Sequence, residues 1–245
     1  MTVPRFVVGS EALAGTRAVL TGPELHHLRV RRLRIGDDLI LCDGAGRQRP
    51  GSVALLTRER AIIHFTAAAA VESESPLRLT LAHALVKADK IDLITEKSTE
   101  LGVQELLLVR TERSLGHVSP GKIERWNRIA RAATKQCQRS TVPRITGPIS
   151  FDALLERGEA LRLLFWESDR RSTLTVSGQT LVPSILAAVG PEGGFSAAEA
   201  AQAAACGFRL VGLGARLLRT ETAAIVAVTL CQFLWGDLRA DSLAR

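Results

Sequence analysis

The chain of 245 residues contains no tyrosine, and its aromatic side chains are limited to seven phenylalanines and three tryptophans. A mechanism in this protein therefore has no phenolic base, nucleophile or hydrogen-bond donor available to it. The scarcity of aromatic residues also argues against a sheet surface that reads single-stranded RNA by stacking several bases on side chains.

Cysteines are few and widely separated, and they form no Cys-x-x-Cys pair. They stand at four positions: Cys42, Cys137, Cys206 and Cys231. This spacing predicts neither a zinc site nor a disulfide framework, so we expect a protein without a metal.

Long apolar runs are also missing. The first residues, Met1–Arg5, lack the apolar stretch of a secretory signal. The longest apolar stretch, Ala223 to Trp235, is interrupted by polar residues and is too short to cross a bilayer. We therefore expect a soluble, cytoplasmic protein with no membrane partner.

The formal net charge of +7 is concentrated in one part of the chain. Residues 110–144 contain nine basic and two acidic side chains, so this segment carries the whole excess. Such a concentration favours phosphate as the partner, although a solvated helix face without a partner would show the same pattern.

A seam of small and polar residues at 67–78, closed by Pro76, divides the chain. Before the seam, short apolar segments separated by Gly-rich turns predict a small β-rich module, with strands at 38–43, 52–56 and 61–66. After it, strands alternate with helices, which predicts an α/β domain with a parallel sheet and helices on both faces. The expected strands are 79–86, 105–109, 161–166, 184–189 and 208–213, and the expected helices are 88–101, 120–137, 152–157, 196–207 and 220–235.

The expected strand 184–189 runs directly into Gly190-Pro191-Glu192-Gly193-Gly194. Three glycines in five residues allow close backbone approach and positive φ angles. The loop matches neither a Walker A motif nor the dinucleotide pattern G-x-G-x-x-G. Its carboxylate suits hydroxyl or amine donors better than phosphate. Ligands of parallel sheets bind at the carboxyl ends of the strands, so we expect one here, with a structural turn as the alternative.

A second loop leads into the expected helix 220–235. Its sequence is Leu213-Gly214-Ala215-Arg216-Leu217-Leu218-Arg219-Thr220-Glu221-Thr222-Ala223. The apolar residues suit a flat ligand, and backbone N–H groups suit its polar edges. Arg219 and Glu221 form a surface ion pair in the alternative interpretation, and their spacing does not decide between the two.

Together, these two loops resemble the signature of the RsmE family, bacterial methyltransferases of the SPOUT superfamily that act on uridine N3 in 16S ribosomal RNA. Further matches are Lys97-x-x-Glu100-Leu101-Gly102-Val103 and Gln136-x-x-Arg139, and the resemblance covers nearly the whole chain. Lys135-Gln136-Cys137 departs from the family pattern, which has Glu-Gln-Ser at this place.

The resemblance implies a PUA-like RNA-binding β-barrel at residues 1–70, a linker at 71–78 and a SPOUT methyltransferase domain at 79–245. It also implies a C-terminal trefoil knot, which periodicity does not reveal because knots are rare exceptions to the rules of chain connection. A homodimer that uses the last helix is implied as well.

For the cofactor, the resemblance implies S-adenosylmethionine held by the knot loops. The residues expected to line its site are Glu167, Val189, Gly190, Glu192, Gly193, Gly194, Leu213, Gly214, Leu218, Thr220 and Ala223.

Methylation at uracil N3 requires the loss of its proton, and the negative charge then spreads onto the two carbonyl oxygens. A cationic donor aimed at one of these oxygens stabilises that charge. Arg219 is the first candidate for this donor and Arg139 the second. Glu221 is a candidate proton acceptor or an orienter of Arg219.

We expect phosphates of 16S ribosomal RNA in the small subunit to contact a set of basic residues: Arg29, Arg31, Arg32, Arg34, Arg113, Arg125, Arg128, Lys135 and Arg139. Two alternatives stay open. One is a knotted methyltransferase that acts on tRNA or 23S ribosomal RNA. The other is a non-catalytic RNA-binding assembly factor on the same scaffold, against which the intact loop 213–223 counts.

Overall fold

A computed structural model describes residues 3–66, 74–168, 174 and 182–238. The chain divides into two compact units. The first comprises Met1–Glu74 together with Arg131–Val142, and the second comprises Ser75–Ala130 and Pro143–Arg245. Residues 71–73 of the expected linker lie outside the described part. The contribution of Arg131–Val142 to the first unit was not predicted from the sequence.

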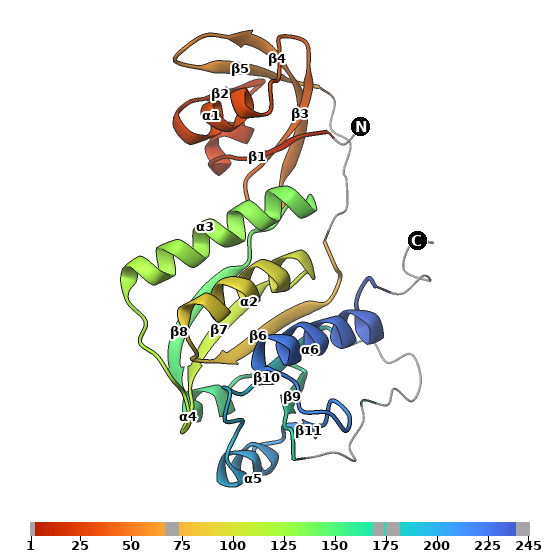
Figure 1. The fold of residues 1–245 in the computed structure, drawn as a ribbon. Helices are drawn as coiled ribbons and strands as arrows, with labels where there is room; N and C mark the ends of the chain where they lie inside the picture. The colour runs from red at the N-terminus through yellow and green to blue at the C-terminus, as the bar shows by residue number, and fades with distance from the viewer. Residues whose placement is uncertain (1–2, 67–73, 169–173, 175–181, 239–245) are drawn as a thin grey trace. The chain divides into compact units, whose positions relative to one another are not determined.

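The first unit is built on a five-stranded sheet in the order β1-β3-β4-β5-β2. Its elements are β1 (Arg5–Val7), η1 (Ser10–Leu13), β2 (Arg17–Leu20), α1 (Gly22–Val30), β3 (Asp38–Cys42), β4 (Gln48–Leu56) and β5 (Ala61–Phe65). All neighbouring strands pair antiparallel except β1 and β3, which run parallel. Phe6, Leu28 and Ile63 are fully buried in its core. The expected strands are present (Figure 1), whereas β1, β2 and α1 were missed because they are short and carry weak periodicity.

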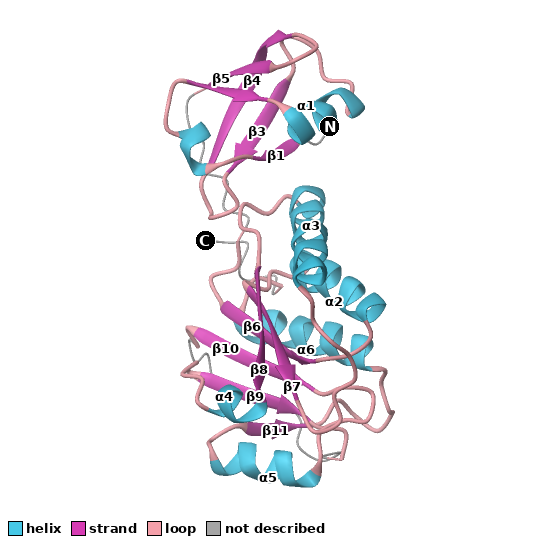
Figure 2. Cartoon of the chain, turned by 90° about the vertical axis from the view of Figure 1, so that its left-hand side faces the viewer, coloured by secondary structure: helices cyan, strands magenta, loops and turns pink. Residues whose placement is uncertain are grey.

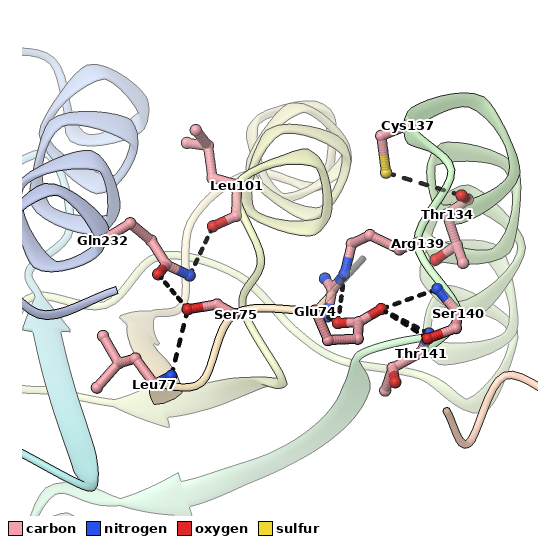
Figure 3. A network of polar contacts seen from close by, with 10 residues as sticks. All are labelled: Glu74, Ser75, Leu77, Leu101, Thr134, Cys137, Arg139, Ser140, Thr141 and Gln232. Atoms are coloured by element: carbon pink, nitrogen blue, oxygen red, sulfur yellow. Dashed lines mark hydrogen bonds and ion pairs between the residues drawn. The ribbon is translucent and has the colours of Figure 1, made fainter. Parts of the chain in front are cut away.

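A buried ion pair holds Arg131–Val142 within the first unit. The side chain of Arg139 is only 4% exposed, and its Nε and Nη2 lie 3.1 and 2.8 Å from Glu74 Oε2. The other carboxylate oxygen of Glu74 accepts hydrogen bonds from the backbone N–H groups of Ser140 and Thr141, both at 2.8 Å (Figure 3). One carboxylate therefore fixes the chain that follows the long helix.

The second unit contains a six-stranded, entirely parallel sheet in the order β11-β9-β10-β6-β7-β8. Its strands are β6 (Arg78–Ala84), β7 (Glu105–Arg110), β8 (Arg144–Ser150), β9 (Leu161–Phe165), β10 (Ser184–Val189) and β11 (Arg209–Val211). The sequence did not predict β8. It is an edge strand in which only Ile145 is buried, so its apolar pattern is weak.

Helices cover both faces of this sheet, as the alternating pattern predicted (Figure 2). The covering helices are α2 (Ala88–Glu100), α4 (Phe151–Leu155), α5 (Ala197–Ala205) and α6 (Thr220–Trp235), whereas α3 (Pro120–Cys137) belongs to the second unit up to Ala130 and to the first unit from Arg131. α2 packs against α6, which lies on β6 and β10, while α4 and α5 share a core on the opposite face. Along β10, Leu186 and Ala188 point into that core and Ile185, Ala187 and Val189 point to the other face. Burial on both faces explains the unbroken apolar run of this strand.

Helix boundaries follow from local chemistry. Ser196 and Glu199 form a capping box at the start of α5, because each side chain accepts a hydrogen bond from the backbone N–H of the other. Near the end of α6, Gln232 is fully buried: it accepts a hydrogen bond from Ser75 Oγ at 2.7 Å and donates one to the Leu101 carbonyl oxygen at 3.0 Å (Figure 3). These bonds tie α6 to the end of α2 and to the segment before β6.

Replacement of Glu74 by Ala leaves the buried Arg139 guanidinium without its counter-charge. We expect Glu74→Ala to lower the free energy of unfolding by about 3 kcal/mol, since removing one partner of a largely buried ion pair is strongly destabilising. Urea denaturation followed by circular dichroism measures the change. Glu59→Ala, which removes an exposed carboxylate from a turn of the same unit, is the control. Equal midpoints for the two variants would contradict a structural role for the Glu74–Arg139 pair.

Candidate functional site

The carboxyl ends of β9, β10 and β11 lie side by side at one edge of the parallel sheet. Val189 pairs with Phe165, and Phe165 pairs with Val211, so the three following loops leave the sheet at the same level. Glu167 lies on the first of these loops, the predicted glycine-rich segment on the second and Leu213 to Leu218 on the third. The fold thus brings together the residues that the sequence predicted as a ligand site, at the edge where parallel sheets bind ligands.

The glycine-rich loop folds into a tight turn. The Gly194 N–H donates to the Pro191 carbonyl oxygen at 2.9 Å, and Gly194 has a φ of +66°. A Cβ atom on Gly194 would lie 2.0 Å from Glu167 Oε1, so the Glu167 carboxylate lies directly against this glycine. A Cβ on Gly190 would meet the backbone of Phe195 and Gly194 at 3.0–3.2 Å. The positive φ of Gly194 is strained for any other residue, and the space beside Gly190 is tight for a side chain.

A buried hydroxyl joins this loop to the first turn of α6. Thr220, 5% exposed, donates from Oγ1 to the Gly190 carbonyl oxygen at 2.6 Å. The Oγ1 atom of Thr220 also lies 3.1 Å from Nε2 of His83, a fully buried residue of β6. Burial lowers the pKa of His83, and its Nδ1 donates to the Ala84 carbonyl oxygen at 2.7 Å. The Thr220 side chain thus binds the backbone of the glycine-rich loop from the buried side.

Two further residues beside the site, His83 and Lys90 in the first turn of α2, were not predicted from the sequence. Lys90 Nζ lies 3.1 Å from Glu192 Oε1 and 3.3 Å from Glu221 Oε2. His83 gave one available signal, a lone histidine in the apolar stretch 79–86. Lys90 gave none, because both of its partners are more than 100 residues away in the chain.

The surroundings of Glu221 decide between the two roles that the sequence left open for it. Burial acts to raise the pKa of Glu221, but hydrogen bonds from its own backbone N–H and from Lys90, with the nearby charge of Arg219, outweigh it. The net pKa lies below the ordinary value. Glu221 is therefore ionised at neutral pH and a poor proton acceptor, which favours an electrostatic role. Its ion-pair partner is Lys90, while Arg219 is exposed at the N-cap of α6.

Arg113 reaches the glycine-rich loop as well. Its Nη1 donates to the Gly193 carbonyl oxygen at 2.7 Å, and the neighbouring Glu112 N–H donates to Glu199 Oε1 at 2.8 Å. The loop after β7 is thereby held against the loop after β10. The sequence predicted Arg113 as an RNA contact, and the structure places it beside the expected cofactor residues.

Several other predicted RNA contacts are paired inside their own units. Arg125 Nε lies 3.1 Å from Asp92 Oδ1, Lys135 forms an ion pair with Glu24, and Arg29 Nη2 donates to the Thr57 carbonyl oxygen at 2.7 Å. Arg139, also predicted as the second catalytic candidate, is buried against Glu74 and holds the backbone of the first unit. The remaining predicted contacts are exposed: Arg31, Arg32, Arg34 and Arg128.

The surface of the two loops suits a ligand with a flat apolar part and polar edges. Leu213 and Leu218 are half-buried, and Gly214 is exposed with a φ of +91° and open space where a Cβ would stand. Glu192 and Gly193 are exposed on the other loop. Val189 is buried and Ala223 half-buried behind these residues. S-adenosylmethionine, the cofactor that the family resemblance implies, has a flat adenine and cationic sulfonium and ammonium groups that would match the nearby carboxylates.

Across the described ranges, no group of three or more His, Cys, Asp or Glu side chains is arranged to hold a metal ion. The four cysteines are free thiols. In the same ranges, no helix is both long enough and apolar enough to cross a membrane.

Comparison with protein families identifies both parts of the chain. Residues 73–232 match the RNA methyltransferase domain family, and residues 20–66 match the RNA methyltransferase PUA domain family. Among curated proteins, ribosomal RNA small subunit methyltransferase E of Synechocystis sp. is 35% identical and covers 91% of this chain and 75% of its own length. The protein of the same name from Bacillus subtilis is 31% identical over 91% of this chain and 92% of its own length.

Solved structures show the same similarity. The chain is similar to a ribosomal RNA small subunit methyltransferase E from Neisseria gonorrhoeae bound to S-adenosyl methionine, with a TM-score of 0.89 and 32% identity over 97% of this chain and 100% of that one. A putative methyltransferase from Legionella pneumophila, in complex with the same cofactor, gives a TM-score of 0.86 and 30% identity over 97% and 100%.

The Thr220 hydroxyl is a direct target for mutation. Thr220→Val keeps the shape of the side chain but leaves the buried Gly190 carbonyl oxygen without a donor. We expect a loss of about 1–3 kcal/mol in the free energy of unfolding, measured by urea denaturation. Thr220→Ser retains the hydroxyl and serves as the control. If Val and Ser variants unfold alike, the hydroxyl does not hold the loop.

Proposed function

This chain belongs to the family of ribosomal RNA small subunit methyltransferase E, and from this premise we propose that it methylates N3 of a uridine in 16S ribosomal RNA, with S-adenosylmethionine as the donor. The observation that carries the proposal is the junction of the glycine-rich loop with the first turn of α6, made by Thr220 and Gly190. The two relatives solved with the cofactor, which match almost the whole chain, support it.

We assign the cofactor to the loops at the carboxyl edge of the sheet. When bound, S-adenosylmethionine supplies a methyl group already activated on a sulfonium, so the protein has to position and stabilise the reactants. The residues that would hold the cofactor are those exposed or half-buried on these loops: Glu167, Glu192, Gly193, Gly194, Leu213, Gly214 and Leu218. Gly190, Val189, Thr220 and Ala223 would shape the site from behind. The C-terminal knot stays a prediction of the family resemblance.

Arg219 is the residue we assign to the reacting base. It carries a guanidinium group and lies at the N-terminus of α6, where the helix dipole adds positive potential. Both effects stabilise negative charge on a uracil carbonyl oxygen once N3 has lost its proton. Glu221, whose lowered pKa makes it a poor proton acceptor, is assigned to the ion pair with Lys90 and not to the proton transfer.

We further propose that exposed arginines in each unit contact RNA phosphates, since phosphate contacts position an RNA without reading its sequence. In the first unit these are Arg31, Arg32 and Arg34, in or beside the part that matches the PUA domain family. In the second unit, Arg128 is the exposed candidate on α3. A homodimer formed through α6 and a cytoplasmic location complete the proposal.

A methyl-transfer assay tests the proposed reaction. The purified full chain is incubated with methyl-labelled S-adenosylmethionine and small ribosomal subunits that lack the modification, and digested nucleosides are separated by mass spectrometry. We expect label in 3-methyluridine from 16S ribosomal RNA. Label in a tRNA or 23S nucleoside would instead establish a methyltransferase with another substrate. Subunit binding without transfer would indicate an assembly factor, and either outcome overturns the proposal.

A variant of Arg219 separates its catalytic role from cofactor binding. We expect Arg219→Ala to lower kcat about 100-fold, as loss of a donor to a developing oxyanion does, while the Kd for S-adenosylmethionine changes less than about twofold. Arg209→Ala, at an exposed arginine of β11, is the control. Calorimetry and the transfer assay give the two numbers. If Arg219→Ala lowers kcat and weakens the binding of S-adenosylmethionine by similar factors, the arginine belongs to the cofactor site or to the fold.

A further inference from the structure

Lys90 occupies a position where three separate segments meet. It extends from the first turn of α2, its partner Glu192 belongs to the loop after β10, and its partner Glu221 belongs to the first turn of α6. The three side chains are 25%, 31% and 14% exposed, so the cluster is only partly open to solvent. Ion pairs in such a setting are screened less than pairs on an open surface.

A second lysine of the same helix shows what is particular to Lys90. Lys97 also contacts two carboxylates, with Nζ at 2.6 Å from Glu96 Oε1 and 2.9 Å from Glu100 Oε1. Both of these partners lie on α2 itself, so these two contacts of Lys97 stay within one helix. Lys90 makes the same kind of contact but joins two distant parts of the chain.

The Lys90 cluster lies next to the buried hydrogen bond between Thr220 and Gly190. Glu192 follows Gly190 by two residues, and Glu221 follows Thr220 directly. Thr220 and Gly190 are buried, whereas Glu192 is exposed. The same two segments are therefore tied twice, by a hydroxyl on the inside and by an ammonium nearer to solvent.

Lys90 also offsets the negative charges of Glu192 and Glu221. Without it, the carboxylates of Glu192 and Glu221 would face each other and repel, which would push the loop away from α6. The Glu192 carboxylate, together with Glu221, raises the pKa of Lys90, and Lys90 contributes to the lowered pKa of Glu221. Lys90 and Glu221 are therefore both ionised at neutral pH.

We propose that Lys90 is a positioning residue that holds the loop 190–194 against the first turn of α6 in the conformation that binds the methyl donor. This role rests on the proposed function, because it assigns the loop to S-adenosylmethionine. Pre-ordering a loop removes the cost of ordering it at the moment of binding. Loss of Lys90 should therefore weaken donor binding more than it slows a saturated enzyme.

The test compares Lys90→Met with Lys97→Met in the full chain. Two readouts use the protein without RNA: hydrogen exchange of backbone amides in residues 190–194 without ligand, and the Kd for S-adenosylmethionine by calorimetry. We expect Lys90→Met to speed the exchange and weaken the Kd, each about tenfold, which corresponds to about 1.4 kcal/mol. KM for the donor should rise by a similar factor with kcat changed less than about threefold. Lys97→Met should stay within about twofold of the wild type.

Two further variants keep the test decisive if Lys90→Met folds poorly. Lys90→Arg retains the charge and should restore most of the binding. Glu192→Gln removes one partner and should reproduce the loop exchange of Lys90→Met without ligand, with little further increase in the double variant. Loop exchange and donor affinity equal to those of Lys97→Met would overturn the role of Lys90. Failure of the wild type to bind S-adenosylmethionine would instead refute the proposed function, while loop exchange would still test the Lys90 contact.

Discussion

The hydrogen bond from the Thr220 hydroxyl to the Gly190 carbonyl oxygen is the constraint on which the candidate site depends. It joins the loop after β10 to the first turn of α6, two segments that come together only because β10 and α6 pack on each other. Because the bond is buried, breaking it leaves the Gly190 carbonyl oxygen without a hydrogen-bond donor, which costs free energy. The loop after β10 and the first turn of α6 are therefore held together. Lys90 joins the same loop and helix turn a second time, nearer to solvent, through its ion pairs with Glu192 and Glu221.

Much of the fold followed from the sequence, and the structure brings the expected site residues together at one edge of the sheet, for identifiable reasons. The strand 184–189 is buried on both faces, so its apolar run is continuous, and the glycines at 190 and 194 stand where a Cβ would collide. The contacts of Lys90 and His83 could not be predicted from the sequence, because their partners lie far away in the chain. The surface of an isolated helix does not show that a lysine in its first turn meets two distant carboxylates.

The basic residues among residues 110–144 differ in how much of their charge is available to RNA. Their basic excess first indicated a surface for phosphate, yet the structure shows several of these charges already paired. Arg139 is neutralised by the buried contact with Glu74, Lys135 by Glu24 and Arg125 by Asp92, while Arg113 bonds to the cofactor loop. A count of charges in sequence therefore overstates the positive potential available to RNA, and exposed arginines such as Arg128 matter more than the total.

The most direct test of the account is hydrogen exchange of the full chain, followed by mass spectrometry, with and without S-adenosylmethionine. If the loops after β10 and β11 form one donor site, both residues 190–194 and residues 213–220 will gain protection together on binding. Protection of just one loop, or protection that appears at the opposite, amino edge of the sheet while these loops stay unchanged, would contradict it.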